Sequence, residues 1–179
     1  MASDRMIWRH RITGEIRIDD YVAETVAALT GAQTKEDVIA AIIAENRLTS
    51  AAHAEYDFVG LAPAVDLPWE RGAADRRDAS RRYVNLRGGA RWESGEVVID
   101  IEAAKAALVA LVAARGEELL ASDKNALRLA LGEVAGQEAA TMRDRRRAIM
   151  DLPAQMATEL AGIASAEDLA AFHWPAELT

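Results

Sequence analysis

Near the amino terminus the sequence alternates between apolar and polar positions, as one-sided β-strands do. Over residues 7–19, β-branched and aromatic side chains are separated by polar ones, and Thr13-Gly14 supplies a short turn. This pattern predicts a β-hairpin. Residues 94–100 repeat the order of turn, short strand and aspartate found in residues 13–19. The repeat predicts a strand over residues 96–99. It arises either from the same local physics or from a duplicated strand–helix unit whose two strands share one sheet.

Apolar residues at three- and four-residue spacings predict helices in the rest of the amino-terminal half. One helix is expected over residues 20–30, and a second opens at Thr34 in a sequence that resembles a capping box. A short helix over residues 50–58 precedes a proline-containing loop over residues 60–72. The arginine-rich residues 73–84 have moderate helical character.

Helices dominate the prediction for the carboxyl-terminal half. The longest helix follows Asp100, an N-cap residue, and its apolar face is formed by Ile101, Ala104, Leu108, Leu111 and Val112. Later boundaries come from capping residues, glycine and proline. In chain order the predicted boundaries are Gly116 or residue 121, Ser122 or Asp123, residue 150, Pro153 at the start of a helix, Gly162 and Ser165.

Composition supports the helical prediction. Alanine, the best helix former, accounts for 39 of 179 residues, and aromatic residues, which favour strands, make up only 5%. We therefore expect a mainly α fold with a small β component, a helical bundle that carries one or two short hairpin or strand elements. The length predicts a single domain over residues 1–179. Its possible sub-units are a hairpin with helices (1–60), a Pro/Arg-rich connector (61–95) and a strand with a helical bundle (96–179).

The sequence offers few groups for catalysis. It has no cysteine, which excludes thiolate nucleophiles, cysteine zinc sites and disulfides, and its three histidines lie far apart. His53, Glu55 and Asp57 are close in sequence, but residues two apart on a helix point in different directions. Gly88-Gly89 lacks the spacing of a phosphate-binding loop. We therefore predict no catalytic, cofactor-binding or metal-ligating residue and no cofactor.

No membrane association is expected either. The longest apolar run covers residues 106–114, about half of the roughly 20 residues that a bilayer span needs. The first ten residues lack the apolar core of a signal peptide. The expected location is the cytoplasm, or a virion if a bacteriophage encodes the protein.

The charge is unevenly distributed. The formal net charge is −8, which argues against general nucleic-acid binding, yet seven of the 18 arginines fall within residues 71–91. Guanidinium groups bind carboxylates and phosphates bidentately, and arginine and tryptophan are enriched at interface hot spots. The predicted partner-binding residues are Trp69, Arg76, Arg77, Arg81, Arg82, Arg87 and Trp174. The alternatives are internal pairing of these arginines with acidic residues, and a Trp69 ring that covers the edge of the core.

A second arginine cluster, residues 143–147, is predicted near a helix end, where the helix dipole favours positive charge. The segments that follow are RAIM (147–150), SAEDLAAF (165–172) and Trp174-Pro175. They comprise a small-residue helix, a serine cap, an acidic-leucine step and a tryptophan. In these segments the chain resembles the helical ends of some bacteriophage tail-fibre accessory domains. The resemblance implies a structural protein of a phage or mobile element, and no functional residue is transferred from it.

Three functions remain open. The first is a non-catalytic interaction protein that docks onto a larger assembly, for example the tail or head–tail region of a phage virion, with protein partners or further copies of itself. The second is a small cytoplasmic enzyme in which His53, Asp57 and the arginine segment act on an anionic substrate. The third is a nucleic-acid-associated regulator that binds through residues 71–91.

Overall fold

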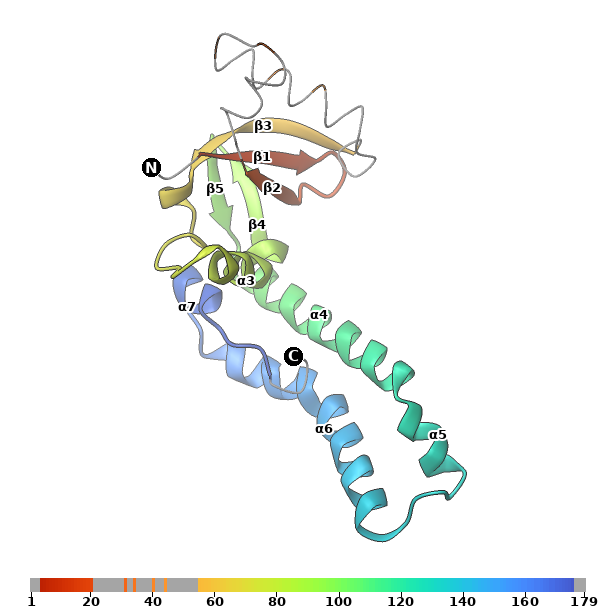
Figure 1. Ribbon diagram of the computed structural model, residues 1–179. Coiled ribbons are helices and arrows are strands. Elements are labelled where there is room, and N and C mark those ends of the chain that lie inside the picture. The colour runs from red at the N-terminus through yellow and green to blue at the C-terminus, as the bar shows by residue number, and fades with distance from the viewer. Residues whose placement is uncertain are drawn as a thin grey trace.

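The computed structural model describes residues 4–20, Gly31, Thr34, Ala40, Ala44 and residues 55–175 (Figure 1). Residues 21–30 of the first predicted helix and most of the helix that opens at Thr34 lie outside the described residues, while Asp20 ends a strand. The described elements form two small antiparallel sheets followed by a helical region. The predicted fold class, mainly α with a small β component, is confirmed.

The predicted amino-terminal hairpin is confirmed. Strands β1 (Asp4–His10) and β2 (Ile16–Asp20) pair antiparallel, with Ile7 opposite Ile18. Strand β3 (Tyr56–Pro63) pairs with the other edge of β1, so the order of this sheet is β2-β1-β3. Met6, Ile7 and Trp8 are all buried. Because successive residues of a strand point to opposite faces, β1 is covered on both of its faces.

Strand β3 corrects two predictions. Residues 56–58 were expected to end a helix, and residues 60–63 to begin a loop, but all of them belong to the strand. A short apolar run does not distinguish strand from helix by itself, and pairing with β1 decides the outcome here. A single 3₁₀ turn, η2 (Ala64–Asp66), follows the strand.

The second sheet is a separate hairpin of β4 (Ala90–Glu93) and β5 (Glu96–Ile99). Its turn residues Ser94 and Gly95 both have positive φ, 51° and 89°, as the tightest hairpin turns require. The strand over residues 96–99 is therefore confirmed, whereas β4 was not predicted. Strands β2 and β5 lie in different sheets, so the idea of a duplicated unit sharing one sheet is wrong.

Helix α3 (Arg76–Leu86) and the 3₁₀ turn η3 (Arg87–Gly89) link the sheets to the longer helices. The Tyr83 hydroxyl donates a hydrogen bond of 2.9 Å to the Ile16 carbonyl of β2. Gly88 and Gly89 allow η3 to lie against the start of α4. A β-carbon on Gly89 would overlap the Asp100 carbonyl oxygen, and one on Gly88 would overlap the Ala107 side chain. The two glycines therefore form a turn and also allow η3 to pack closely against α4.

Helices α4 (Ile101–Ser122), α5 (Lys124–Ala130) and α6 (Gly136–Ala161) form a long helical arm that extends away from the sheets (Figure 1). Helix α4 runs out along the arm, α5 lies at its far end, and α6 returns beside α4. Near the sheets, the short helix α7 (Ala166–Ala170) packs against α3. No described helix is both long and apolar enough to cross a membrane.

The predicted N-caps of α4, α5 and α7 are correct, but two boundaries within the arm are wrong. The side chains of Asp100, Asp123 and Ser165 each accept a hydrogen bond from an amide in the first turn of their helix. The helix expected from residue 123 to 150 is instead interrupted after α5, where Gly132 has a φ of 72°. Pro153 does not begin a helix but lies inside α6.

The inner face of α4 uses a four-residue spacing. Four residues of this face are buried: Ala104, Leu108, Val112 and Gly116. The first three of these belong to the predicted apolar face. Gly116 packs against Ile149, the residue four before Pro153, whose carbonyl cannot receive the usual amide hydrogen bond. The two helices therefore approach closely where proline removes a backbone hydrogen bond.

One hydrophobic core runs from the first sheet into the arm. Residues 61–95, predicted as a connector, contribute Leu67, Trp69, Leu86 and Ala90 to it. This segment is part of the folded body and not a linker between sub-units.

Candidate partner-binding site

The arginines of the basic segment have different roles, and Arg82 is structural. Its guanidinium donates hydrogen bonds to the carbonyls of Arg71 (2.8 Å) and Gly72 (3.0 Å), and it pairs with Asp78 at 3.3 Å. The pKa of Asp78 lies below its usual value, mainly because the Ala74 amide donates a hydrogen bond to the carboxylate and also because Arg82 does so. Arg82 therefore fastens the loop before α3 to that helix and is not presented to a partner.

Arg87 and Arg71 form ion pairs across the fold. Arg87 lies 3.5 Å from Glu15, which joins η3 to the amino-terminal hairpin. Arg71 lies 3.2 Å from Glu167 of α7 and donates to the Asp66 carbonyl at 2.7 Å. For these two arginines and for Arg82, the alternative of internal pairing is what the structure shows.

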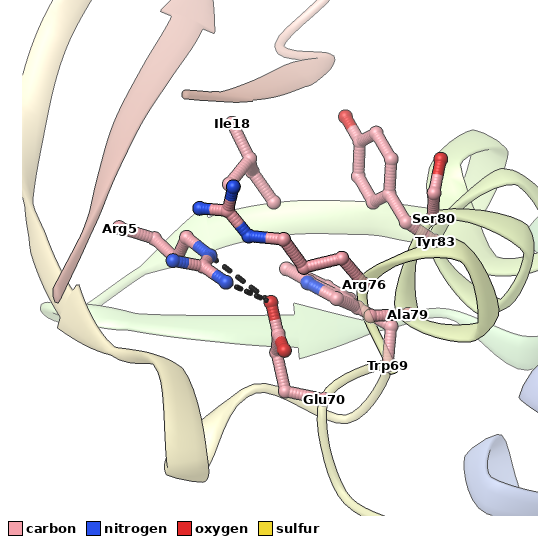
Figure 2. A pocket seen from close by; sticks show the side chains of 8 residues that line it. All are labelled: Arg5, Ile18, Trp69, Glu70, Arg76, Ala79, Ser80 and Tyr83. Carbon is pink, nitrogen blue, oxygen red and sulfur yellow. Dashed lines mark hydrogen bonds and ion pairs between the residues drawn. The ribbon is translucent and has the colours of Figure 1, made fainter. Parts of the chain in front are cut away.

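Trp69 is buried, with 2% of its surface exposed, and its ring meets Tyr83 edge to face at 5.2 Å between ring centroids. The prediction of an exposed partner-binding ring is therefore wrong, because the ring covers the core edge. Beside it is a pocket of about 220 Å³ that is lined by both charged and apolar side chains (Figure 2). There the buried Arg5 donates two hydrogen bonds to Glu70, at 2.8 and 3.0 Å, and Arg76 extends from α3 over the pocket.

Arg77 and Arg81 differ from their neighbours. They lie one helical turn apart on α3 and are exposed. Neither makes a hydrogen bond or an ion pair within the part of the chain that the structure describes. These two guanidinium groups are thus available for an outside anion.

Asn85, at the last turn of α3, holds the carboxyl-terminal segment in place. It is 1% exposed, and its side-chain amide donates to the carbonyls of Leu169, Ala170 and Phe172 at 3.2, 3.0 and 2.9 Å. Its side-chain oxygen accepts a hydrogen bond of 2.8 Å from the indole of Trp174. Trp174 is therefore half-buried and anchored to α3, which fixes residues 169–174 along the helix.

A groove of about 350 Å³ lies between α3 and this segment. Its lining residues are Ser80, Arg81, Val84, Phe172, His173 and Trp174. The structure thus brings two predicted residues, Arg81 and Trp174, into one groove that also has an apolar wall. Sequence reasoning missed Asn85, Phe172 and His173, although a lone asparagine near the end of an arginine-rich helix and the Phe-His-Trp run were visible signals.

The groups considered for catalysis are not assembled in the described residues. His53 lies outside them. Glu55 lies 3.3 Å from His10, and Asp57 pairs with Arg11 at 3.0 Å. His10 also accepts hydrogen bonds through Nδ1 from the Ile12 and Thr13 amides, so it stabilises the hairpin turn. Over residues 4–20 and 55–175, no group of three His, Asp or Glu side chains is placed to hold a metal ion.

The second arginine cluster lies within α6 and not near its carboxyl end. Arg146 pairs with Asp123 at 2.9 Å, and the pKa of Asp123 is lowered chiefly by this hydrogen bond. Arg143 and Arg147 are exposed and one turn apart, and like Arg77 and Arg81 they make no hydrogen bond or ion pair within the described part of the chain.

No known family, curated protein or solved structure matches this chain. Any function must therefore be argued from the geometry of the described residues.

Proposed function

We propose that this chain is a non-catalytic interaction protein that docks onto a protein partner within a larger assembly, and that α3 and residues 172–174 form the docking surface. The observation that supports this most directly is that Arg77 and Arg81 are exposed and unpaired over the described residues, beside a groove lined by Phe172 and Trp174. Three other arginines of the segment, Arg71, Arg82 and Arg87, form ion pairs within the fold itself. Arginine and tryptophan beside apolar surface are typical of interface hot spots.

The same observation favours a protein partner over a nucleic acid. Affinity for a nucleic acid grows with the number of phosphates that basic side chains neutralise. Since Arg71, Arg82 and Arg87 are engaged within the fold, the basic segment offers fewer free charges than its sequence suggests. A bacteriophage virion is our proposal for the assembly, on the resemblance of residues 147–175 to tail-fibre accessory domains.

The test is recovery of the protein from the cells that produce it, with the mass of the native species measured by light scattering. The test variant carries Arg77→Ala and Arg81→Ala. The matched control carries Arg143→Ala and Arg147→Ala, which removes two exposed arginines with the same spacing from α6. We expect the wild type and the control in a large assembly and the test variant as a free chain.

Folding of the test variant is checked separately. Exposed charges contribute about 0–1 kcal/mol, so its free energy of unfolding should change by less than about 1 kcal/mol. Recovery of the wild type as a lone chain, or equal behaviour of both variants, would refute the proposal. Release of the chain by nuclease treatment would select the nucleic-acid alternative.

A further inference from the structure

The groove between α3 and the carboxyl-terminal segment is shaped by hydrogen bonds within the chain itself and not by contacts with a ligand. Asn85 ties the segment to α3 through Leu169, Ala170, Phe172 and Trp174. The backbone of this segment and the Trp174 ring are therefore held in place before anything binds. A preformed wall lowers the entropic cost of binding, because this segment does not have to be ordered by the ligand.

The walls differ in chemistry. Val84, Phe172 and Trp174 provide apolar surface, while Ser80, Arg81 and His173 provide polar groups. The indole N–H of Trp174 is already donated to Asn85, so this residue presents its ring and no free donor. Arg81 lies near enough to Asp78 to help lower the pKa of that carboxyl, but it makes no hydrogen bond or ion pair within the described part of the chain. An occupant must therefore place an anionic group at Arg81 and apolar atoms against the rings.

The size of the groove limits the occupant. Its volume of about 350 Å³ lies at the lower end of the range for small-molecule sites, about 300–1,000 Å³. It can accept one or two side chains but not a folded element. A carboxylate matches the planar fork of a guanidinium, and the apolar wall favours an aliphatic or aromatic neighbour over a second charge.

We propose that this groove binds a short partner segment in which an aspartate or glutamate stands next to a large apolar residue, with the carboxylate on Arg81 and the apolar side chain against Phe172 and Trp174. This inference rests on the proposed function, because it names the partner chemistry of the same surface. Charge complementarity supports it, since a free guanidinium adjoins an apolar wall.

The experiment is an NMR titration of the full chain with the peptide acetyl-Gly-Asp-Leu-Gly-amide. Its counterpart with asparagine in place of aspartate is the ligand control. We expect the indole signal of Trp174 and the amide of Arg81 to shift with the aspartate peptide. The asparagine peptide should bind about tenfold more weakly, because it loses a charge-assisted hydrogen bond.

The protein variants are Arg81→Gln and, as a matched control, Arg147→Gln. Arg81→Gln should weaken the aspartate peptide about tenfold, whereas Arg147→Gln should leave its affinity unchanged. Equal binding of both peptides, or shifts confined to other parts of the molecule, would overturn the inference. Binding of inorganic phosphate at Arg81 in preference to the peptide, or dimerisation through this groove, would also overturn it.

The two proposals fail separately. If the native assembly requires Arg77 and Arg81 but the peptides do not bind, the groove inference is wrong and the docking function stands. If the aspartate peptide binds as described but the assembly survives the double substitution, the groove is a binding site and the docking function is wrong.

Discussion

Replacing Asn85 by alanine should destabilise the protein far more than a single polar substitution usually does. The side-chain amide has two hydrogens, which three carbonyls share, and the side-chain oxygen accepts the Trp174 indole N–H. Three hydrogen-bonding protons are therefore involved. At about 1 kcal/mol for each hydrogen bond, their loss costs about 3 kcal/mol, and the small cavity adds to this cost.

Urea denaturation followed by circular dichroism measures the free energy of unfolding of wild type and Asn85→Ala. We expect a decrease of about 3 to 4 kcal/mol. A decrease below about 1 kcal/mol would refute the reasoning, because it would mean that water satisfies the released carbonyls and the indole at little cost.

Asn85→Asp is the matched variant, since it keeps the shape but removes the donors. A carboxylate facing three carbonyls is disfavoured, so the pKa of this aspartate should be raised in the folded state. A raised folded-state pKa means that stability is highest below the unfolded-state pKa and is lost as the pH rises through the folded-state value. Asn85→Asp should therefore be less stable than Asn85→Ala at neutral pH and should recover in acid. Stability that does not depend on pH would contradict the donor role of Asn85.

Three further predictions concern the arm and its root. Leu108→Ala should cost about 2–5 kcal/mol in urea denaturation, because Leu108 is 2% exposed and its loss leaves a core cavity; a near-neutral effect would disprove the assigned helix face. Gly89→Ala should lower the melting temperature sharply because of the overlap with α4, whereas Gly162→Ala, with φ −81° and no atom closer than 3.9 Å, should leave it nearly unchanged. Arg146→Ala should raise the pKa of Asp123 in a carboxyl ¹³C NMR titration. The lowered pKa of Asp123 stabilises the folded protein at pH values above the ordinary carboxyl pKa, and this stabilisation is lost as the pH falls through the lowered value. The urea midpoints of wild type and variant should therefore converge in acid. A difference that stays constant in acid would contradict the pairing.

Features set by neighbouring residues could be predicted from the sequence. The hairpin over residues 7–19 and the caps at Asp100 and Ser165 depend on contacts within a few positions, and they are correct. Strand β4 pairs with β5 across the two-residue turn Ser94-Gly95, so its partner is local, and that turn was a signal in the sequence that the prediction did not use. Strand β3 depends on pairing with β1, which is distant in the chain, and the sequence contains no local sign of that partner. The prediction that Pro153 begins a helix was wrong for a similar reason. Packing of α6 against the distant helix α4 offsets the loss of one backbone hydrogen bond at the proline.

The candidate site could be predicted only in part. Arginine enrichment identified the correct helix, but the separation of structural Arg82 from free Arg77 and Arg81 depends on which carbonyls and carboxylates the fold brings near. Trp69 and Trp174 looked alike in the sequence, because each is a tryptophan next to a proline. Their different burial follows from the core around Trp69 and from the Asn85 contact of Trp174, which spans 89 positions.

The helical arm has a cross-section of only two helices, so each can shield only a narrow stripe from water. Beyond Val112 the buried stripe of α4 continues only with Gly116, and α5 contributes no buried residue. Amide hydrogens near α5 should therefore exchange with solvent through small local openings, whereas those around Leu108 should exchange only when the whole chain unfolds. The arm is therefore expected to be rigid near the sheets and to open more easily at its far end, around α5.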